Sequence, residues 1–592
     1  MDRTRKTFGI ILTLFVALIA GVAYMSLTGK NAASPAPTSA PAVAPTKAPA
    51  VEATKADSVA AARKTEAPAP TSAPADAAAP TAAPVDAKPA DQGGRLKPIW
   101  GALYKENDGL GKIVCGAYAF SADYVLQQIQ TSGLDVKNGF HLGIVPFYLN
   151  ENYIVTAQDR SAALKDGTLD CLLTTFDLMA LEDPGIMTMF INESAGGDQM
   201  WARNMNSIND LRGKRIAFEA NGPSAYFVYD LLNTVQLKPS DVVLLPQPTQ
   251  ADAIDVFNKG EADAVSGWEP VIFGAEKGGG KPLATSKDFR SILGGVVFAP
   301  EAIKQKRAVI QGFHDAWFDA LDVWDTDFGK AAQSIADWGN NEYLGVKKES
   351  AEQDMRILIS GVAQASLADN ARALGDLPLV TRRMQQARGL WATAGHTVPT
   401  SDVTKLVDPS FVLSAARVRG VDPQAVNNFP NNTFSLGRTS MPVAAKAPVD
   451  TTGATASATA TPATVAPTTV LATLPCRRFE FLPNSTQLQP QSQQELNDCA
   501  LGVLQQNITL YVKVKGSSAW PGPKGSIAQA AVESTAKARA QAIVDYLVAQ
   551  GVNAERFVVE WTLPPEANRE TTDLTKQASD RYVEISLLAS GL

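Results

Sequence analysis

The sequence predicts an α/β protein of two similar lobes, followed by a smaller α+β domain and preceded by an N-terminal transmembrane helix. Three observations support this prediction. A unit of helix, glycine turn and short apolar strand occurs twice, about 90 residues apart. Apolar strands and helices alternate between residues 96 and 420. Two Ala/Pro/Thr-rich stretches divide a chain of 592 residues, which is too long for one hydrophobic core.

The composition argues against several classes of function. The net charge of -7 is modest, and no basic block along the chain indicates nucleic-acid binding. The four cysteines are too few for a disulfide scaffold and lack a metal-binding spacing. His141, His314 and His396 stand far apart in the sequence. We therefore expect no metal site, no cofactor and no nucleic-acid partner.

Residues 1–30 have the pattern of a membrane anchor. Arg3, Arg5 and Lys6 precede an apolar run from Phe8 to about Leu27, which is long enough to span a bilayer. Gly21-Val22-Ala23 offers a cleavage site as the alternative, but the run is longer than the core of a usual signal peptide. We favour an uncleaved anchor with its basic end in the cytoplasm, which makes the rest of the chain extracytoplasmic.

Two stretches contain too few large apolar residues to bury a core. Residues 31–95 are rich in Ala and Pro, and residues 421–475 are rich in Thr, Ala and Pro. We expect both stretches to be extended linkers. They delimit a domain at residues 96–420 and a second domain at residues 476–592.

The segment from residue 258 to 270 predicts a helix end, a turn and a strand. Gly260 suits the left-handed residue that closes a helix. Ala262–Ser266 is short and apolar, as expected of a buried parallel strand, and Trp268 and Glu269 follow it in a loop. Open α/β sheets bind their ligands at the carboxyl ends of such strands.

An earlier segment repeats this pattern. Gly167 is followed three residues later by Asp170, then by a short apolar strand and by Thr174-Thr175-Phe176-Asp177. Two such units indicate two lobes that each direct a loop toward a shared cleft. The alternative is that the repeat carries no meaning, because any α/β protein contains helix–glycine–strand units.

Further elements complete the two lobes. Lys112–Gly116 predicts a buried strand whose following loop carries Tyr118. Ser224 is expected to cap a helix start, where backbone N–H groups face a ligand. Gly294–Ala299 predicts a strand that returns to the first lobe. Amphipathic helices that would cover this lobe are expected at Phe313–Trp324 and Lys330–Trp338.

The order and spacing of these motifs resemble the nitrate/sulfonate/taurine-type periplasmic binding proteins of ABC importers. The resemblance spans roughly Lys97 to Arg419. It implies a type II fold, in which two α/β lobes joined by two crossover strands close on a small molecule, and an ABC permease as partner. The matching residues are Thr174–Asp177, Gly196–Asp198, Asp210–Ile216, Gly222–Ser224, Gly260–Ala264 and Trp268–Pro270.

A set of side chains near the predicted cleft is expected to bind the ligand. Hydroxyl groups and backbone amides suit fixed polar contacts, and aromatic rings supply flat walls. Two alternatives stay open, since Trp268 would also suit a core position between the lobes and Asp198 the cap of a turn or hinge. The predicted ligand-binding residues are Tyr118, Thr175, Asp198, Ser224, Trp268 and Glu269.

The charges in the predicted loops bear on the class of ligand. Asp177 and Glu269 supply carboxylates near the cleft, whereas no arginine occurs in these loops. This pattern disfavours nitrate or a sulfonate. It favours a molecule with an amine or a ring, which a carboxylate and a cation–π contact would bind.

The last segment resembles the outer-membrane protein A (OmpA)-like peptidoglycan-binding domain, over Cys476 to about Leu588. Its strands and helices follow in that order, beginning with an expected strand at Arg478–Phe481. The resemblance implies that the cell wall is a partner of this domain. The matching residues are Phe479–Ser485, Lys537–Ala540, Asp545–Leu547 and Asp580–Ile585.

One position of this domain departs from the family pattern. In the family, an arginine of the long helix and an aspartate after the central strand grip a peptide-stem diamino acid. Arg539 falls at the arginine position, but Ala519 stands where the aspartate is expected. The carboxylate that would pair with a ligand ammonium group is therefore missing. Arg581 is expected to line the site or to be a structural surface residue, so peptidoglycan binding stays open.

The cysteines form two sequence pairs. Cys115 and Cys171 are expected on neighbouring strands, as buried free thiols. Cys476 and Cys499 flank the start of the last domain, where an oxidising compartment permits a disulfide. For the second pair both states stay open.

These features together predict a solute-binding protein, anchored in the cytoplasmic membrane with most of the chain in the periplasm. It would capture a small organic molecule for an ABC importer and carry a cell-wall-directed domain. The alternative is a ligand sensor, or a structural tether between membrane and peptidoglycan, without transport. An enzyme is not expected, because pyrimidine-synthesising relatives of this fold need a cysteine-rich motif and histidine chemistry that the cleft sequence lacks.

Overall fold

The computed structural model describes most of the chain beyond the first predicted linker. The predicted anchor at residues 1–30 and the linker at residues 31–95 lie outside the described residues. Among the helices of the described ranges, none combines the length and apolar character that a bilayer crossing requires. The described residues are 97–118, 120–147, 157–339, 344–425, 427–429, 434–436, 469–476, 479, 481–482 and 485–589.

A seven-stranded sheet forms the centre of the first lobe, in the order β1-β3-β2-β4-β11-β5-β12. β2 is parallel to β3 and β4, whereas β11 runs antiparallel between β4 and β5. β3 and β11 are buried along their whole length, as expected of apolar strands at the centre of a sheet. The strands are β1 Ile99–Trp100, β2 Gly111–Ala117, β3 Phe140–Pro146, β4 Cys171–Thr175, β5 Ile186–Ser194, β11 Leu293–Phe298 and β12 Val362–Gln364.

Helices pack on this sheet and fill its core with large aromatic side chains. Trp317 and Trp324 of α9 and Trp391 of α13 are fully buried. The two predicted amphipathic helices are confirmed as α9 and α10, and α9 contacts β2 and β3. The helices are α2 Val125–Ser132, α3 Leu134–Lys137, α4 Ala157–Lys165, α5 Phe176–Glu182, α8 Pro300–Gln305, α9 Arg307–Thr326, α10 Phe328–Ala336, α11 Ala351–Leu358, α12 Leu367–Gly375, α13 Leu377–Thr393 and α14 Ser410–Arg419. Shorter 3₁₀ turns are η1 Ser121–Tyr124, η6 Lys348–Ser350 and η7 Val403–Lys405.

The second lobe contains a five-stranded sheet in the order β10-β6-β9-β7-β8. β7 is parallel to β8 and β9, and β6 runs antiparallel to β9 and β10. The strands are β6 Asp198–Ala202, β7 Arg215–Glu219, β8 Val243–Gln247, β9 Ala264–Trp268 and β10 Lys281–Thr285. The helices are η2 Ile208–Leu211, α6 Pro223–Thr234, η3 Pro239–Asp241, α7 Gln250–Asn258 and η4 Val271–Gly278.

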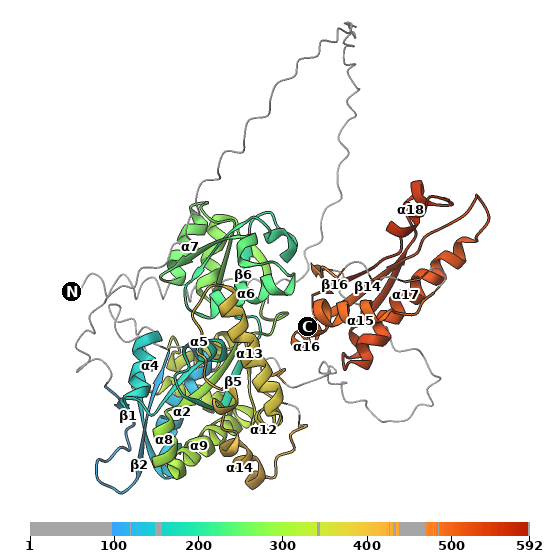
Figure 1. Cartoon of the computed structure of the whole chain (residues 1–592). Helices are drawn as coiled ribbons and strands as arrows, with labels where there is room; N and C mark the ends of the chain where they lie inside the picture. Colours follow the sequence, from blue (N-terminus) through green and yellow to red (C-terminus); the bar gives the residue numbers. More distant parts are fainter. Residues whose placement is uncertain are drawn as a thin grey trace, which may run out of the picture. The chain divides into compact units, whose positions relative to one another are not determined.

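The chain passes between the two lobes twice (Figure 1). β5 of the first lobe leads into β6 of the second, and β10 of the second lobe leads back into β11 of the first. The predicted α/β architecture of two lobes with two crossovers is therefore confirmed. The return strand expected at Gly294–Ala299 is β11, shifted by one residue.

Both copies of the repeated unit are present, with shifted strand bounds. Gly167 follows α4 and Gly260 follows α7, and both have the positive φ of 81° that favours glycine. β9 begins two residues later than expected and extends to Trp268, because its antiparallel pairing with β6 continues to Asp198. Trp268 therefore ends a strand instead of lying in a loop, which leaves Glu269 as the first residue after the strand.

The expected helix cap at Ser224 is wrong. Gly222 is the cap residue of α6, with extended backbone, and Pro223 occupies the first helical position. Proline suits that position because it has no N–H to donate and its φ is already helical. Ser224 is therefore inside the first turn, where its side chain is buried.

The C-terminal domain is a four-stranded sheet in the order β13-β16-β14-β15. The long helix α17 connects β14 to the parallel strand β15, and β16 runs antiparallel to β14. The strands are β13 Val470–Thr473, β14 Tyr511–Ser517, β15 Phe557–Thr562 and β16 Val583–Leu588. The helices are α15 Pro490–Leu496, the π-helix η8 Asn497–Leu501, α16 Gly502–Gln506, α17 Gln529–Ala549, η9 Ala554–Arg556, η10 Glu566–Asn568 and α18 Leu574–Ser579.

The start of this domain differs from the expectation. Phe479 and Phe481 lie outside any strand, and the sheet begins with β13 at residues 470–473, inside the range predicted as the second linker. Composition hides this strand because its residues are Val, Leu, Ala and Thr, which suit a linker as well as an edge strand. Its pairing with β16 is what makes it a strand.

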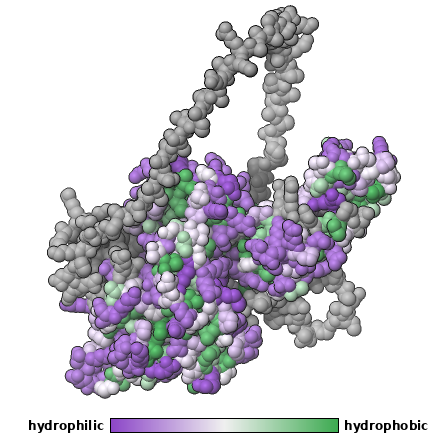
Figure 2. Space-filling view, in the orientation of Figure 1, coloured by the Kyte–Doolittle hydropathy of each residue, from purple (hydrophilic) through white to green (hydrophobic). Residues whose placement is uncertain are grey.

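The outer surface is mostly hydrophilic on the face drawn in Figure 2, with hydrophobic residues in small groups. Large exposed hydrophobic side chains in the described ranges are scattered over all parts, for example Leu103, Val418 and Leu574. Single exposed apolar residues are usual for globular proteins and indicate no function.

All four cysteines form disulfides. Cys115 and Cys171 are opposite one another in the parallel strands β2 and β4, with Cα atoms 4.6 Å apart. The prediction of free thiols at this pair is therefore wrong, since direct pairing brings the two residues within disulfide reach. Cys476 and Cys499 form the second disulfide, with Cα atoms 5.6 Å apart. Structural disulfides are typical of oxidising, extracytoplasmic compartments.

Candidate ligand-binding site at the lobe junction

Two aromatic rings from different lobes meet where the strands end. Phe120, which follows β2, lies edge-on to Trp268, the last residue of β9, with ring centroids 6.4 Å apart. The carboxyl ends of β2 and β9 therefore face each other. We call the region around these two rings, described residue by residue below, the lobe junction. It includes Tyr118, Arg160, Asp177, Glu182, Asp198, Glu219, Trp268 and Glu269.

Tyr118 lies at the first-lobe side of this junction, directly after β2. Its ring packs edge-on against Phe147 at 5.2 Å, and the guanidinium group of Arg160 lies 5.1 Å from the ring centroid. Burial raises the pKa of Tyr118 to about 12, so its hydroxyl group is protonated at physiological pH. A protonated hydroxyl group is able both to donate and to accept hydrogen bonds.

Arg160 is a junction residue that the sequence analysis missed. It is buried on α4, and its Nη2 atom lies 3.4 Å from Oε1 of Glu182. Its charge also lowers the pKa of Glu219, at the end of β7 in the second lobe, although burial raises that pKa more strongly. Loop patterns do not reveal it, but Arg160 shares a helix face with Ala163 and Leu164, a spacing that indicates burial.

Trp268 contacts several junction residues at once. Besides Phe120, its side chain interacts with Glu219, whose pKa burial raises and Trp268 partly lowers, and its carbonyl oxygen accepts a hydrogen bond from Gln250 Nε2 at 2.9 Å. Asp198 is its direct partner across β6 and β9. Paired residues of antiparallel strands project from the same face, so the indole ring and the carboxylate group are neighbours.

Two buried carboxyl groups, those of Asp177 and Asp198, and the half-buried Glu269 influence one another at the junction. Burial raises the pKa of Asp198 to about 6. Burial and the charge of Asp198 raise the pKa of Glu269 to about 7, and Gln199 Nε2 donates a 2.6 Å hydrogen bond to its Oε1 atom. Burial likewise raises the pKa of Asp177 to about 7, with Asp198 and Glu182 adding to the shift. Among the described residues, no ion pair involves Asp177, Asp198 or Glu269.

The two predicted hydroxyl residues lie at the end of a strand and at the start of a helix. Thr175 ends β4, and Ser224 lies in the first turn of α6. Both side-chain oxygens are buried, and neither has a hydrogen-bond partner in the part of the chain that the structure describes. Asp198 and Trp268 are thus neighbours across two strands, and Glu269 follows Trp268 in the chain. Tyr118 lies on the first-lobe side, beside Arg160 and two residues before Phe120. The structure shows no hydrogen bond between the two hydroxyl groups and the other four predicted residues.

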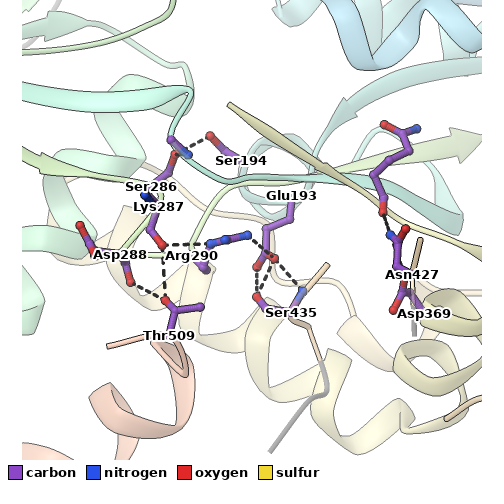
Figure 3. A network of polar contacts seen from close by, with 12 residues as sticks. Glu193, Ser194, Ser286, Lys287, Asp288, Arg290, Asp369, Asn427, Ser435 and Thr509 are labelled. Carbon is purple, nitrogen blue, oxygen red and sulfur yellow. Dashed lines mark hydrogen bonds and ion pairs between the residues drawn. The ribbon is translucent and has the colours of Figure 1, made fainter. Parts of the chain in front are cut away.

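The crossovers beside the junction are tied together by a polar network (Figure 3). Ser194 Oγ and Ser286 Oγ, one from each crossover, lie 2.7 Å apart. The backbone N–H of Asp198 donates to both hydroxyl oxygens, at 3.0 and 3.1 Å. Asp198 therefore takes part in the hinge through its backbone N–H, and its carboxyl group lies at the junction.

A second part of this network lies in the interior of the first lobe (Figure 3). The carboxylate of Glu193, at the end of β5, pairs with Arg290 Nη1 at 3.3 Å, and both side chains are buried. Ser435 donates to this carboxylate from its backbone N–H at 2.9 Å and from its hydroxyl group at 2.6 Å. Asn427 hydrogen bonds to the carbonyl oxygen of Gln364 in β12. Residues beyond α14 thus hold the ends of the crossover strands.

The histidines do not contribute to the junction. His141 pairs with Asp108 at 2.8 Å, His314 stacks on Phe411, and His396 lies against Trp391. The described residues contain no group of three or more His, Cys, Asp or Glu side chains that could hold a metal ion.

The C-terminal domain brings its two predicted arginines close together. Arg539 is buried, and its guanidinium group donates to the carbonyl oxygen of Ser485 at 3.2 Å and to Ser518 Oγ at 3.4 Å. Burial and the charge of Arg581 lower the pKa of Arg539 to about 10. In the described part of the domain neither arginine has a carboxylate ion-pair partner, and Ala519 supplies none.

Comparisons with known proteins match this two-part organisation. Residues 480–581 match the model of the OmpA family. No curated protein matches the chain. Among solved structures, the periplasmic aliphatic sulphonate binding protein SsuA from Escherichia coli is 17% identical, with a TM-score of 0.40, covering 50% of this chain and 92% of that chain.

Two further structures illustrate the range of similar proteins. The periplasmic nitrate-binding protein NrtA from Synechocystis PCC 6803 is 11% identical, with a TM-score of 0.39, covering 54% of this chain and 94% of that chain. The desulfurization enzyme DSZB is 15% identical, with a TM-score of 0.34, covering 52% of this chain and 99% of that chain. Residues 480–581 are therefore an OmpA-family domain, which the chain joins to a two-lobed α/β domain.

Proposed function

We propose that the chain is an extracytoplasmic receptor that captures a small organic molecule at the lobe junction. The observation that carries this proposal is the meeting of strand ends from both lobes at Phe120 and Trp268, amid buried polar side chains without partners. Ligands of α/β sheets bind at such strand ends, and two linked lobes allow closure around a ligand. The proposed ligand contacts are Tyr118, Thr175, Asp198, Ser224, Trp268 and Glu269.

A ligand screen tests this proposal. The full chain in detergent is mixed with a metabolite library, and its thermal unfolding is recorded. A ligand at a hundred times its Kd should add about 2.7 kcal/mol to the free energy of unfolding. Trp268→Ala should remove that stabilisation, because it deletes the aromatic wall. Trp561→Ala is the matched control, since Trp561 is an exposed tryptophan of the C-terminal domain.

The outcome of the screen is decisive in both directions. If no compound of a broad library stabilises the chain, the receptor proposal fails. It fails as well if the ligand stabilises Trp268→Ala as much as it stabilises the control Trp561→Ala and the unsubstituted protein.

We also propose that the receptor delivers its ligand to an ABC permease and is held at the cytoplasmic membrane by residues 1–30. The two disulfides support a location outside the cytoplasm. The apolar run from Phe8 to about Leu27 supports the anchor. Loss of ligand uptake in a deletion strain would support transport. Unchanged uptake with a lost transcriptional response would favour the alternative, a sensor.

The proposal treats the chain as a binding protein and not as an enzyme. The cysteines are engaged in disulfides, and the three histidines lie away from the lobe junction. Cysteine and histidine chemistry, which the pyrimidine-synthesising relatives of the fold need, therefore has no support among the junction residues. Recovery of an unmodified ligand after incubation with the protein would agree with this assignment.

For the C-terminal domain we propose peptidoglycan as the partner. The pair of arginines without carboxylate partners, Arg539 and Arg581, supports this proposal because a guanidinium group binds a stem-peptide carboxylate well. The missing carboxylate at Ala519 argues for weaker binding than in domains that retain the aspartate. A structural tether between membrane and wall is the corresponding alternative if the lobe junction binds no ligand.

A further inference from the structure

We propose that the ligand of the lobe junction is an organic cation with an amine or quaternary ammonium group, bound between Asp198, Glu269 and the ring of Trp268. This inference rests on the proposed receptor function and names the chemical class of its ligand.

The junction has more acidic than basic side chains. Its carboxyl groups are those of Asp177, Glu182, Asp198, Glu219 and Glu269; the basic groups that act on them are Arg160 and, on Glu182, the exposed Lys165. Arg160 is engaged by Glu182 at 3.4 Å and interacts with Glu219. Among the described residues the remaining three carboxyl groups have no cationic partner, so a bound cation would complete the charge balance.

Asp177 provides an independent indication of a missing partner. Its side chain is 1% exposed and has no ion-pair partner in the described ranges; its carboxyl oxygens miss hydrogen-bond geometry, and the neighbouring Thr175 hydroxyl group only partly offsets the rise of its pKa caused by burial. A buried carboxylate without a partner is costly, so the group either keeps a proton or meets a cation. The charge of Asp198 influences Asp177, which assigns the unpartnered group to the same cluster.

The strand register places acid and aromatic ring side by side. Asp198 and Trp268 are opposite residues of β6 and β9 and project from the same face. Glu269 follows Trp268 and is held by Gln199 Nε2 at 2.6 Å. A carboxylate beside an indole face is the arrangement that binds ammonium groups, through a charge-assisted hydrogen bond and a cation–π contact.

The same features argue against a small oxyanion. A nitrate or sulfonate group would lie near the carboxyl groups of Asp198 and Glu269, which would repel it. The guanidinium group of Arg160 is already engaged by acidic neighbours. Arg160 lies on α4, outside the loops to which the sequence expectation applies, and its acidic partners make it a poor anion site.

Cation binding should also release protons. Burial raises the pKa of Asp198 to about 6 and that of Glu269 to about 7. A cation binds the ionised carboxylates, so its affinity should increase as the pH rises from about 5.5 to about 8. An uncharged ligand should show no such increase.

A charge-matched panel tests the inference. Butylamine, putrescine, choline and tetramethylammonium are compared with nitrate, methanesulfonate and butanol, using the full chain in detergent and titration calorimetry. We expect at least one cation to bind, with affinity that rises with pH. Asp198→Asn and Glu269→Gln should each weaken binding about tenfold or more. Glu301→Gln, which removes an exposed carboxylate of α8, is the matched control.

Each outcome separates this inference from the receptor proposal. Binding of nitrate, methanesulfonate or butanol but of no cation would overturn the cation inference and leave a solute receptor. Absence of binding by this panel and by the metabolite library would overturn both. Cation binding that the Asp198 and Glu269 variants do not weaken would place the cation elsewhere and overturn the inference.

Discussion

At the scale of single residues, the buried carboxyl groups of the lobe junction determine how stability depends on pH. Burial raises the pKa of Asp177 and Glu269 to about 7 and that of Asp198 to about 6. In the unfolded chain these values lie near 4. Between about pH 4 and 7 the folded protein therefore holds more protons than the unfolded chain. The stability from this difference is complete below about pH 4 and is lost as pH rises through about 7.

This sign leads to a prediction for Asp177→Asn. The free energy of unfolding of the unsubstituted protein should decrease between pH 5.5 and pH 8, because Asp177 ionises. The asparagine cannot ionise, so the decrease in Asp177→Asn should be smaller by about 2 kcal/mol. Denaturant unfolding of the ligand-free chain at both pH values measures this difference. Glu301→Gln should leave the pH dependence unchanged, because that residue is exposed. Parallel profiles for Asp177→Asn and the unsubstituted protein would contradict the assigned burial.

At the scale of secondary-structure elements, the crossovers are held by buried polar contacts instead of apolar packing alone. Ser194 and Ser286 join the two crossovers, and Glu193 at the end of β5 accepts hydrogen bonds from Arg290 and Ser435. A buried ion pair is costly to break from one side, since the remaining charge stays without a partner. These contacts therefore define how the crossover strands are positioned.

The ion pair allows a direct comparison with a surface pair. Arg290→Met should lower the free energy of unfolding by about 3–5 kcal/mol, because Glu193 would remain buried without its cation. Arg356→Met, which breaks an exposed pair with Glu352 on α11, should cost less than about 1 kcal/mol. Urea unfolding of both variants measures the difference. Equal effects of the two substitutions would show that Glu193 does not depend on Arg290.

At the scale of the whole molecule, the chain combines a two-lobed α/β domain with an OmpA-family domain. If both domains act as proposed, the wall-directed domain would keep the receptor near the membrane and the peptidoglycan layer. Because each proposed function is assigned to its own domain, substitutions in one domain test its function and leave the other domain intact.

Wall binding can be measured by sedimentation with purified peptidoglycan sacculi. The full chain should cosediment with the sacculi, and Arg581→Ala and Arg539→Lys should each reduce the bound fraction, with about tenfold weaker affinity. Lys537→Ala is the matched control, because Lys537 is a basic residue of α17 that lies over Trp561 instead of near Arg539. Thermal unfolding should confirm that the variants are folded. Equal retention of all variants would contradict the proposed role of the arginines.

Local sequence patterns were sufficient to predict the two lobes, the C-terminal domain and most elements. Apolar periodicity and turn glycines such as Gly167 and Gly260 act over a few residues, so they are readable without the fold. Strand bounds were less certain, since the length of β9 depends on its pairing with β6. The same holds for β13, a strand that exists through its pairing with β16.

The sequence by itself determined the order of domains, the repeated strand units and the residue types near their ends, because these follow from periodicity and composition. Only the tertiary structure decided which side chains meet. Arg160 from a helix, Asp198 from a crossover and Trp268 from a strand end are distant in sequence, and the disulfide of Cys115 and Cys171 depends on strand register. Burial and partner charges, which set the acidity of the lobe junction, arise from contacts between elements and not from the order of residues.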